Sequence, residues 1–321
     1  MALKTWVEPL IDKRNIIEFA MNPSSETYKL FKKEDVSSLH FFAWFSLCMN
    51  PSDWALDFIE ENPNYINYNS ICINTNPRVE RMLKDKNNYI CWETLIKNKS
   101  DFALRLMEEN PSNVKWDKIV LEYPMTDEYE NFVNRNHSRF SRKKLFITRF
   151  FVLSNREEIM SVVQNQKTTD ELCYLCRNPH VSDLILDCLR DGRISINCSI
   201  IYNMCMNPND MVVRYLIDNC EDEIFWDKFS LNYSDEAVNY MHNNPDKVNW
   251  GVVADNINSN IVRLFINNFH AYVLPNISLF LHIDNIEFLE LVRDNIIPNV
   301  NYFNIGTNPN IFESEDEIIL K

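Results

Sequence analysis

Short stripes of apolar residues recur along the chain with the spacing of a helix. The stretch 50–63 reads "NPSDWALDFIEENP", with apolar residues from Trp54 at positions i, i+1, i+4 and i+5, and 98–111 reads "NKSDFALRLMEENP", with the same spacing from Phe102. Such stripes are typical of amphipathic helices. Because a helix of about ten residues is marginally stable alone in water, the pattern predicts that neighbouring helices stack.

An aromatic residue returns at a fixed interval between these stripes. Tyr68, Trp92 and Trp116 are 24 residues apart, and Trp226 and Trp250 repeat the interval. An aliphatic residue stands two positions before each, and three of them follow an Asn-Pro pair, as in "ENPSNVKW" and "NNPDKVNW". A fixed period of this kind indicates stacked supersecondary units. We expect the four tryptophans to be buried between such units.

Asn-Pro pairs mark the boundaries between the predicted helices, since nine of the 13 prolines follow an asparagine. Asparagine is a favoured N-cap, and proline is well suited to the first helical position. The residue before proline is also pushed out of the helical region, so the same pair ends the preceding helix. Helices are therefore expected to start at or just after Pro51, Pro77, Pro111, Pro208 and Pro245.

Together these features predict an all-α fold, an α-solenoid of short helix-pair repeats of about 24 residues. We expect roughly eleven repeats in one continuous solenoid with three stretches. Residues 1–124 form the N-terminal repeats, 125–177 form irregular repeats in which the register is broken, and 178–321 form the C-terminal repeats.

The repeat resembles that of the Asn-Pro/Trp tandem-repeat proteins of giant nucleocytoplasmic large DNA viruses, a mimivirus-like repeat family. The best matches read "NPSDWALDFIEENPNYINY" (50–68), "KSDFALRLMEENPSNVKW" (99–116) and "WDKFSLNYSDEAVNYMHNNPDKVNW" (226–250). The resemblance covers most of 50–124 and 178–309 and departs from the pattern after Trp116. It implies a viral repeat protein, and that family brings no catalytic residues to transfer.

Composition excludes several classes of function. Three glycines in 321 residues are roughly an eighth of the number given by an average usage of about 7%. Neither GxGxxG nor GxxxxGK[ST] occurs, which argues against dinucleotide-binding folds and P-loop NTPases. The start, "MALKTWVEPLIDKRNII", lacks the apolar block of a signal peptide. With nine cysteines scattered through apolar positions, we expect reduced thiols in a protein of the host cytoplasm or the virion that is not secreted and is not inserted in a membrane.

One arrangement of possible metal ligands occurs, at Cys173, Cys176, His180 and Cys188. A structural zinc site uses four ligands with a compact second pair, whereas these cysteines lie three residues apart on a predicted helix. We interpret them as core residues. The six histidines show no paired spacing and no triad partner. No enzyme, metal or cofactor is therefore expected.

Charge is the feature that the repeats do not explain. The net charge of −14 belongs to residues 151–321, which contain 11 basic and 25 acidic residues. The opposite sign gathers in "RNHSRFSRKKLFITR", which we call the basic segment. It contains the candidate partner-binding residues Arg135, Arg139, Arg142, Lys143, Lys144 and Arg149.

The basic segment has two interpretations. It is either a solvated helix face with a loop, or a docking patch for an acidic surface, another copy of the chain or nucleic acid. The first functional hypothesis is a non-enzymatic interaction solenoid that presents an extended surface to a viral or host protein. The alternatives are a virion or assembly component and a nucleic-acid-binding protein, the last disfavoured by the acidic total.

Overall fold

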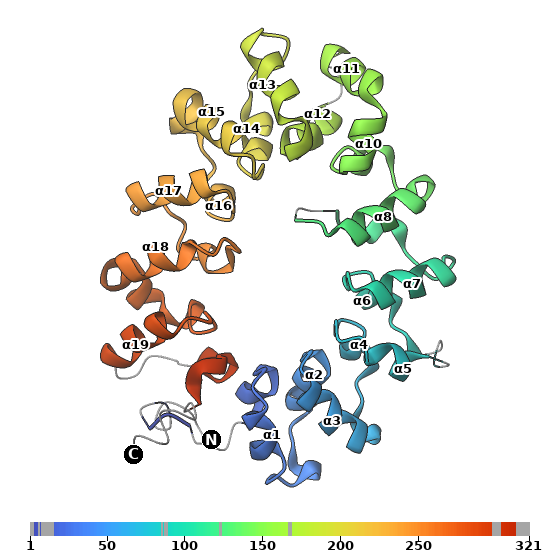
Figure 1. Ribbon diagram of the computed structural model, residues 1–321, viewed down its shortest axis with the longest axis vertical. Helices are drawn as coiled ribbons and strands as arrows, with labels where there is room; N and C mark the ends of the chain where they lie inside the picture. The colour runs from blue at the N-terminus through green and yellow to red at the C-terminus, as the bar shows by residue number, and fades with distance from the viewer. Residues whose placement is uncertain are drawn as a thin grey trace. The chain divides into compact units, whose positions relative to one another are not determined.

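The computed structural model describes residues 3–5, 7, 16–84, 86, 89–121, 124–165, 169–296 and 303–312. These residues are mostly helical (Figure 1), and among them β-structure is limited to one isolated antiparallel bridge between Leu3 and Phe312. The all-α prediction is therefore confirmed. No helix in the described ranges has the length and apolar character needed to cross a lipid bilayer.

The chain forms two compact units, and their boundaries differ from the three stretches that we expected from the repeat register. Unit 1 comprises residues 1–118 and 269–321, and unit 2 comprises residues 119–268. The subdivision at 124 and 177 concerns the register of the repeats, and it stays a prediction.

Unit 1 consists of short α-helices joined by single turns of 3-10 helix. Its α-helices are α1 (Glu26–Phe31), α2 (Phe41–Met49), α3 (Asp53–Glu61), α4 (Tyr68–Ile71), α5 (Val79–Leu83), α6 (Trp92–Leu95), α7 (Asp101–Glu109) and α19 (Ile286–Asp294). Its 3-10 turns are η2 (Ile16–Met21), η3 (Val36–Ser38), η4 (Pro63–Tyr65), η6 (Trp116–Lys118), η12 (Leu274–Leu279), η13 (Phe303–Thr307) and η14 (Pro309–Ile311), and η11 (Phe269–Val273) is a π-helical turn.

Unit 2 has the same composition of elements. Its α-helices are α8 (Asp127–Arg135), α9 (Arg142–Leu145), α10 (Arg149–Ser154), α11 (Arg156–Asn165), α12 (Thr169–Arg177), α13 (Ser182–Arg190), α14 (Cys198–Met204), α15 (Asp210–Cys220), α16 (Trp226–Phe229), α17 (Asp235–Asn243) and α18 (Ile261–Asn267). Its 3-10 turns are η7 (His137–Arg139), η8 (Pro179–Val181), η9 (Glu221–Glu223) and η10 (Val253–Asp255).

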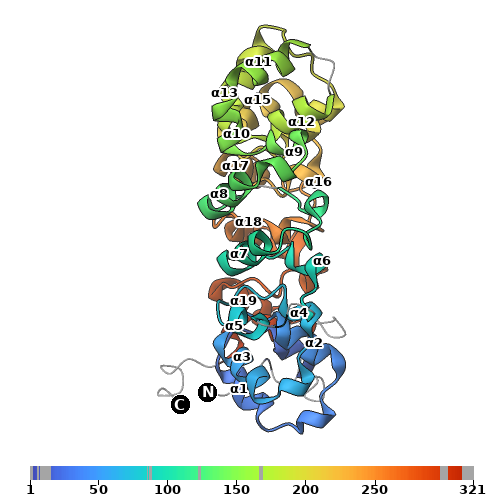
Figure 2. The same cartoon turned by 90° about the vertical axis from the view of Figure 1, so that its right-hand side faces the viewer.

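The helices of unit 2 lie in two rows. Figure 2 shows α8, α13 and α17 along one side of the unit and α9, α12 and α16 along the other. Successive helices belong to alternate rows. In Figure 1, α14 and α16 lie on one side and α15 and α17 on the other. The apolar stripe of each helix faces the core between the rows, where Val213, Leu216 and Phe229 have no exposed surface.

Buried asparagines join successive helix pairs. In unit 1 the Nδ2 of Asn74 donates to the carbonyl oxygens of Cys48 and Asn50 at 3.0 and 2.8 Å, and its Oδ1 accepts from the backbone N–H of Asn76 at 2.9 Å. Asn98 then donates to Cys72 and Asn74 in the same way, at 2.9 and 2.8 Å. Each of these side chains therefore satisfies two buried carbonyls of the preceding pair, which water cannot reach.

We call this series the asparagine ladder, and it occurs in both units. Its members share a buried side chain whose Nδ2 donates to backbone carbonyls 24–32 residues earlier in the chain, or, for Asn22, to the carbonyls of Gly306 and Asn308. They are Asn22, Asn50, Asn74, Asn98 and Asn308 in unit 1, and Asn178, Asn207, Asn232 and Asn256 in unit 2.

Within unit 1 the ladder joins the two ends of the chain. Asn22 donates to the carbonyl oxygens of Gly306 and Asn308 at 2.8 and 2.9 Å. The contact between the η2 segment and η13 is therefore of the same kind as the contact between one helix pair and the pair before it. A backbone hydrogen bond of 2.9 Å from Lys4 to Ile311 continues this contact.

A second set of asparagines ends the longer helices. The Nδ2 of Asn110 donates to the carbonyl oxygen of Leu106 at 3.0 Å, one turn back in α7. Asn62 and Asn244 do the same at the ends of α3 and α17. These side chains satisfy carbonyls that a helix C-terminus leaves without partners.

The expected helix starts are confirmed at three of the five prolines. Helices α3, α5 and α15 begin two residues after Pro51, Pro77 and Pro208. The expectation is wrong at Pro111 and Pro245, where the chain forms turns over 111–113 and 245–247. Before the three confirmed prolines, the asparagine Oδ1 accepts from the N–H two residues on, at the start of the new helix. Asn110 and Asn244 instead donate their Nδ2 to carbonyls of the helix that ends.

Of the four tryptophans that we expected to be buried, one is. Trp250 is buried, but Trp92, Trp116 and Trp226 are half-buried. The indole Nε1 of Trp250 donates to the carbonyl oxygen of Pro245 at 3.0 Å, and that of Trp116 donates to Pro111 at 3.1 Å. In these two copies the indole N–H therefore stabilises the turn that starts at the Asn-Pro pair.

Candidate functional site

An open groove in unit 2 gathers cationic and aromatic side chains that the repeat does not require. It has a volume of about 610 Å³ and is lined by residues of α12 and α14, by Lys143 of α9, by Met206 after α14, by Phe225 just before α16 and by Lys228 within α16. Three cations and three aromatic residues define its chemistry: Lys143, Arg177, Lys228, Tyr174, Tyr202 and Phe225. Volumes of this size are typical of sites that hold a small molecule or a few side chains of a partner.

Helical periodicity places these side chains on one side of α12 and α14. In α12 the groove residues Cys173, Tyr174 and Arg177 alternate with Leu175 and Cys176, which are completely buried. In α14 the groove takes Cys198, Ser199 and Tyr202, whereas Ile200, Ile201 and Met204 face the core. The sequence of each helix thus divides into a core stripe and a groove stripe.

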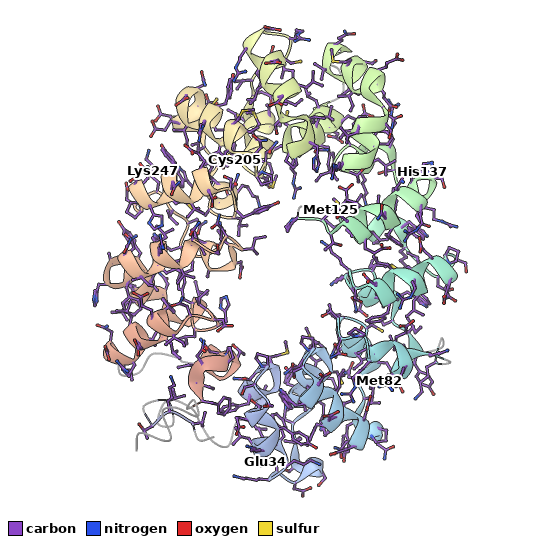
Figure 3. The ribbon with its side chains drawn as sticks, in the orientation of Figure 1. Glu34, Met82, Met125, His137, Cys205 and Lys247 are labelled. Carbon is purple, nitrogen blue, oxygen red and sulfur yellow. The ribbon has the colours of Figure 1, made fainter. Side chains whose placement is uncertain are left out.

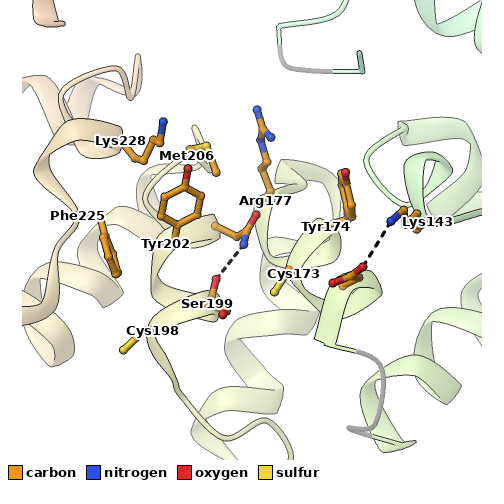
Figure 4. A pocket seen from close by; sticks show the side chains of 12 residues that line it. Lys143, Cys173, Tyr174, Arg177, Cys198, Ser199, Tyr202, Met206, Phe225 and Lys228 are labelled. Carbon is orange, nitrogen blue, oxygen red and sulfur yellow. Dashed lines mark hydrogen bonds and ion pairs between the residues drawn. The ribbon is translucent and has the colours of Figure 1, made fainter. Parts of the chain in front are cut away.

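The groove side chains are held by contacts with one another. Tyr202 and Phe225 pack edge to face, with ring centroids 5.5 Å apart, and the ammonium group of Lys228 lies 5.6 Å from the centre of the Tyr202 ring. Figure 4 shows Arg177, Tyr174 and Tyr202 projecting to the same side of their helices. A cation beside an aromatic face is typical of sites that combine charge and apolar recognition.

One carboxylate lines the groove. Asp170 is exposed and lies 3.5 Å from the Nζ of Lys143. With three cations against one carboxylate, the lining has an excess of positive charge within a unit that contains 15 basic and 21 acidic residues. The groove is therefore a local positive site on an acidic unit.

Of the six residues of the basic segment, Lys143 alone lines this groove. Arg135 forms an ion pair with Glu128 at 3.0 Å, and Arg142 forms one with Glu158. The Nζ of Lys144 donates to the carbonyl oxygen of Ile119 at 2.7 Å. These three contacts hold Arg135, Arg142 and Lys144 against the surface of unit 2.

The other two members of the segment are exposed. Arg139 lies in η7, and Arg149 begins α10, where its backbone N–H donates to Glu130 at 3.0 Å. The segment is therefore divided among four elements, α8, η7, α9 and α10. Its role in binding stays a prediction, with Lys143 as its link to the groove.

Sequence reasoning missed Arg177 and Lys228. They lie 51 residues apart in the chain, so no cluster of basic letters points to them. A signal was present in "CYLCR", where Tyr174 and Arg177 share a helical face opposite the apolar residues. The folding of α12 beside α14 then brings that face next to Tyr202 and Lys228.

The cysteines behave as core thiols or as parts of the groove wall. All nine are free. Burial raises the pKa of the Cys176 thiol far above its ordinary value, and burial also raises the pKa of Cys173. Cys198 is exposed at the start of α14. In the part of the chain that the structure describes, no three His, Cys, Asp or Glu side chains converge as a metal site would require.

The chain was compared with models of protein families, with curated proteins and with solved structures, and none of them matches it.

Proposed function

We propose that this chain is a non-enzymatic interaction protein, an α-solenoid of helix-pair repeats that uses the groove on unit 2 to bind a protein with an acidic surface. The observation that carries the proposal is the groove itself. It collects Lys143, Arg177 and Lys228 with aromatic side chains, although neither the apolar stripes nor the asparagine ladder needs them.

The solenoid arrangement is supported by the ladder. In unit 2 Asn232 donates to Asn207, and Asn256 donates to Asn232, each at 2.9 Å, so these successive pairs are joined to one another. Proteins built from neighbour contacts of this kind typically present extended binding surfaces.

The groove lining favours binding over catalysis. Its one carboxylate, Asp170, is exposed and forms an ion pair with Lys143 at 3.5 Å. Cations next to aromatic rings instead suit the recognition of carboxylates flanked by apolar groups. The virus-like repeat suggests a viral or host protein as the partner, present in the host cytoplasm or the virion.

A virion or assembly component is the second candidate, because acidic and basic surfaces on the same chain favour contacts between copies. Nucleic acid is the third, since cations and aromatic rings also occur together in single-strand sites. A net charge of −14 opposes that reading.

Cross-linking from the groove tests the proposal. A photo-activated residue in place of Asn203, which lines the groove, should capture a protein whose recovery is unaffected by nuclease. Capture should fall at least about tenfold when Lys143 and Lys228 are both changed to glutamate.

Lys247→Glu is the matched control. Lys247 is an exposed lysine of the same unit that forms an ion pair with Glu221 at 3.0 Å, and it lies on the turn after α17 (Figure 3). It does not line the groove. Equal capture by the double variant and the control would contradict the proposed function, and nuclease-sensitive capture would support the nucleic-acid alternative.

A further inference from the structure

The chain itself contains a segment whose chemistry complements the groove. Residues 313–320 read "ESEDEIIL", with four carboxylates in five positions followed by three apolar residues. This segment lies outside the described residues, directly after Phe312. The groove offers the complementary set, three cations and a wall of Tyr202, Phe225 and Met206.

We propose that the groove of unit 2 binds the acidic segment 313–320 of a second copy of this chain. The inference rests on the proposed function and names the partner. Carboxylates of the segment pair with Lys143, Arg177 and Lys228, and its Ile-Ile-Leu end packs on the aromatic wall. Because the guanidinium of Arg177 has several donors in one plane, it can hold a carboxylate through two hydrogen bonds.

The size of the groove fits a short peptide. Its 610 Å³ corresponds to the space of about 20 water molecules. A stretch of five extended residues spans at most about 18 Å, so the four carboxylates of the segment lie close together.

Nucleic acid fits the same groove less well. Binding to a polyanion gains strength from many phosphate contacts along its length, whereas the lining has three cations and one carboxylate. A long polyanion also extends beyond the groove over a unit in which acidic residues outnumber basic ones by 21 to 15. A segment with four charges meets less of that repulsion.

The contact has a consequence for assembly. Two different surfaces meet, a groove on one copy and a segment on the other, so the contact is heterologous. Contacts of this type join copies head to tail and form rings or open chains. The inferred contact would therefore serve an assembly role, and it should weaken with salt because charge dominates it.

Sedimentation velocity of the full chain tests the inference, at about 50 mM and about 500 mM salt. The groove variant carries Lys143→Glu and Lys228→Glu. The segment variant carries Glu313→Gln, Glu315→Gln, Asp316→Asn and Glu317→Gln. Lys247→Glu is the control. We expect the parent and the control to self-associate at low salt, and each of the other two variants to remain monomeric.

Mixing the groove variant with the segment variant provides the decisive arm. The mixture holds one intact groove and one intact segment on different copies, so it should form a dimer that grows no further. A labelled peptide "ESEDEIIL" should bind the segment variant, with a Kd at least about tenfold higher for the groove variant carrying the same four substitutions.

Three results would overturn the inference. They are a parent that stays monomeric at low salt, a segment variant that associates as the parent does, and a single-stranded oligonucleotide that binds more tightly than the peptide. If the segment variant behaves like the parent while the groove variant loses its cross-linked protein, the inference fails and the proposed function stands.

Discussion

Asparagine performs two separate structural tasks in this chain. In the ladder, Asn74 is buried and uses both its amide hydrogens and its carbonyl oxygen to join neighbouring helix pairs. At the end of α7, Asn110 is half-buried and satisfies one carbonyl of its own helix. The same residue type therefore contributes unequally to stability, depending on how many buried groups its loss leaves without partners.

This difference can be measured in unit 1. Asn74→Ala leaves the carbonyls of Cys48 and Asn50 without their donor in a buried site, and we expect it to lower the free energy of unfolding by about 3 kcal/mol. Asn110→Ala removes one hydrogen bond at a half-buried site and should cost about 1 kcal/mol. Urea denaturation of both variants checks this, and equal losses would show that the ladder has no special weight.

A second comparison concerns tryptophan. Trp54 is 5% exposed, and its Nε1 donates to the carbonyl of Asn22 at 3.1 Å, whereas Trp116 is half-buried over its own turn. Trp54→Ala should cost about 3–5 kcal/mol, as the truncation of core aromatics does, and Trp116→Ala about half of that or less. Thermal unfolding distinguishes the two, and a larger loss for Trp116→Ala would contradict this assignment of their environments.

At the scale of elements, the sequence predicted much of the helical content and some of the boundaries. The stripes from Trp54 and Phe102 predicted α3 and α7, because an amphipathic pattern can be recognised within a short stretch of sequence. The Asn-Pro pair predicted helix boundaries less well, because its asparagine has different tasks in different copies. Asn110 caps the helix before it, whereas Asn207 joins the ladder. Which task an asparagine performs depends on partners about 25 residues away, and local propensity does not reveal them.

The groove was predictable only in part for the same reason. Lys143 belonged to a visible cluster of charge, but the other cations of the groove come from α12 and from α16. These cations come close together because the helices stack. The spacing of Arg177 and Lys228 in the sequence does not indicate this. A sequence search for charge therefore finds one of the three groove cations.

The division of α12 and α14 into core and groove faces predicts a pattern of thiol reactivity. Thiolate is the reactive form, so a raised pKa slows alkylation at pH 8. Burial raises the pKa of Cys48 and of Cys205 to about 11, so both stay protonated at that pH, and Cys176 is shielded further by complete burial. Cys198 is exposed and should be alkylated first.

Mass spectrometry of peptides after brief iodoacetamide treatment measures this order. We expect modification of Cys198 at least about tenfold faster than that of Cys205. Because Cys198 lines the groove, a bound acidic peptide should slow its alkylation in the native protein. Faster reaction at Cys205 than at Cys198 would contradict the described faces of α14.

In the whole molecule, the residues that build the fold are separate from the residues that line the groove. The recurring asparagines and apolar stripes build each unit, and we propose that the cations of the groove, which the ladder does not use, bind the partner. This separation implies that damage to the ladder stays local at first, because repeats are coupled mainly to their neighbours. It also implies that charge changes in the groove alter binding while leaving stability within about 0.5 kcal/mol.

Hydrogen exchange of the Asn232→Ala variant, followed by mass spectrometry, tests this construction most directly. Asn232 donates to the carbonyls of Cys205 and Asn207 and accepts from the N–H of Ser234. The account predicts faster exchange in peptides that cover 198–207 and 226–243, and unchanged exchange in peptides from residues 50–109 of unit 1. Uniform acceleration across both units, or no acceleration near Asn232, would contradict it.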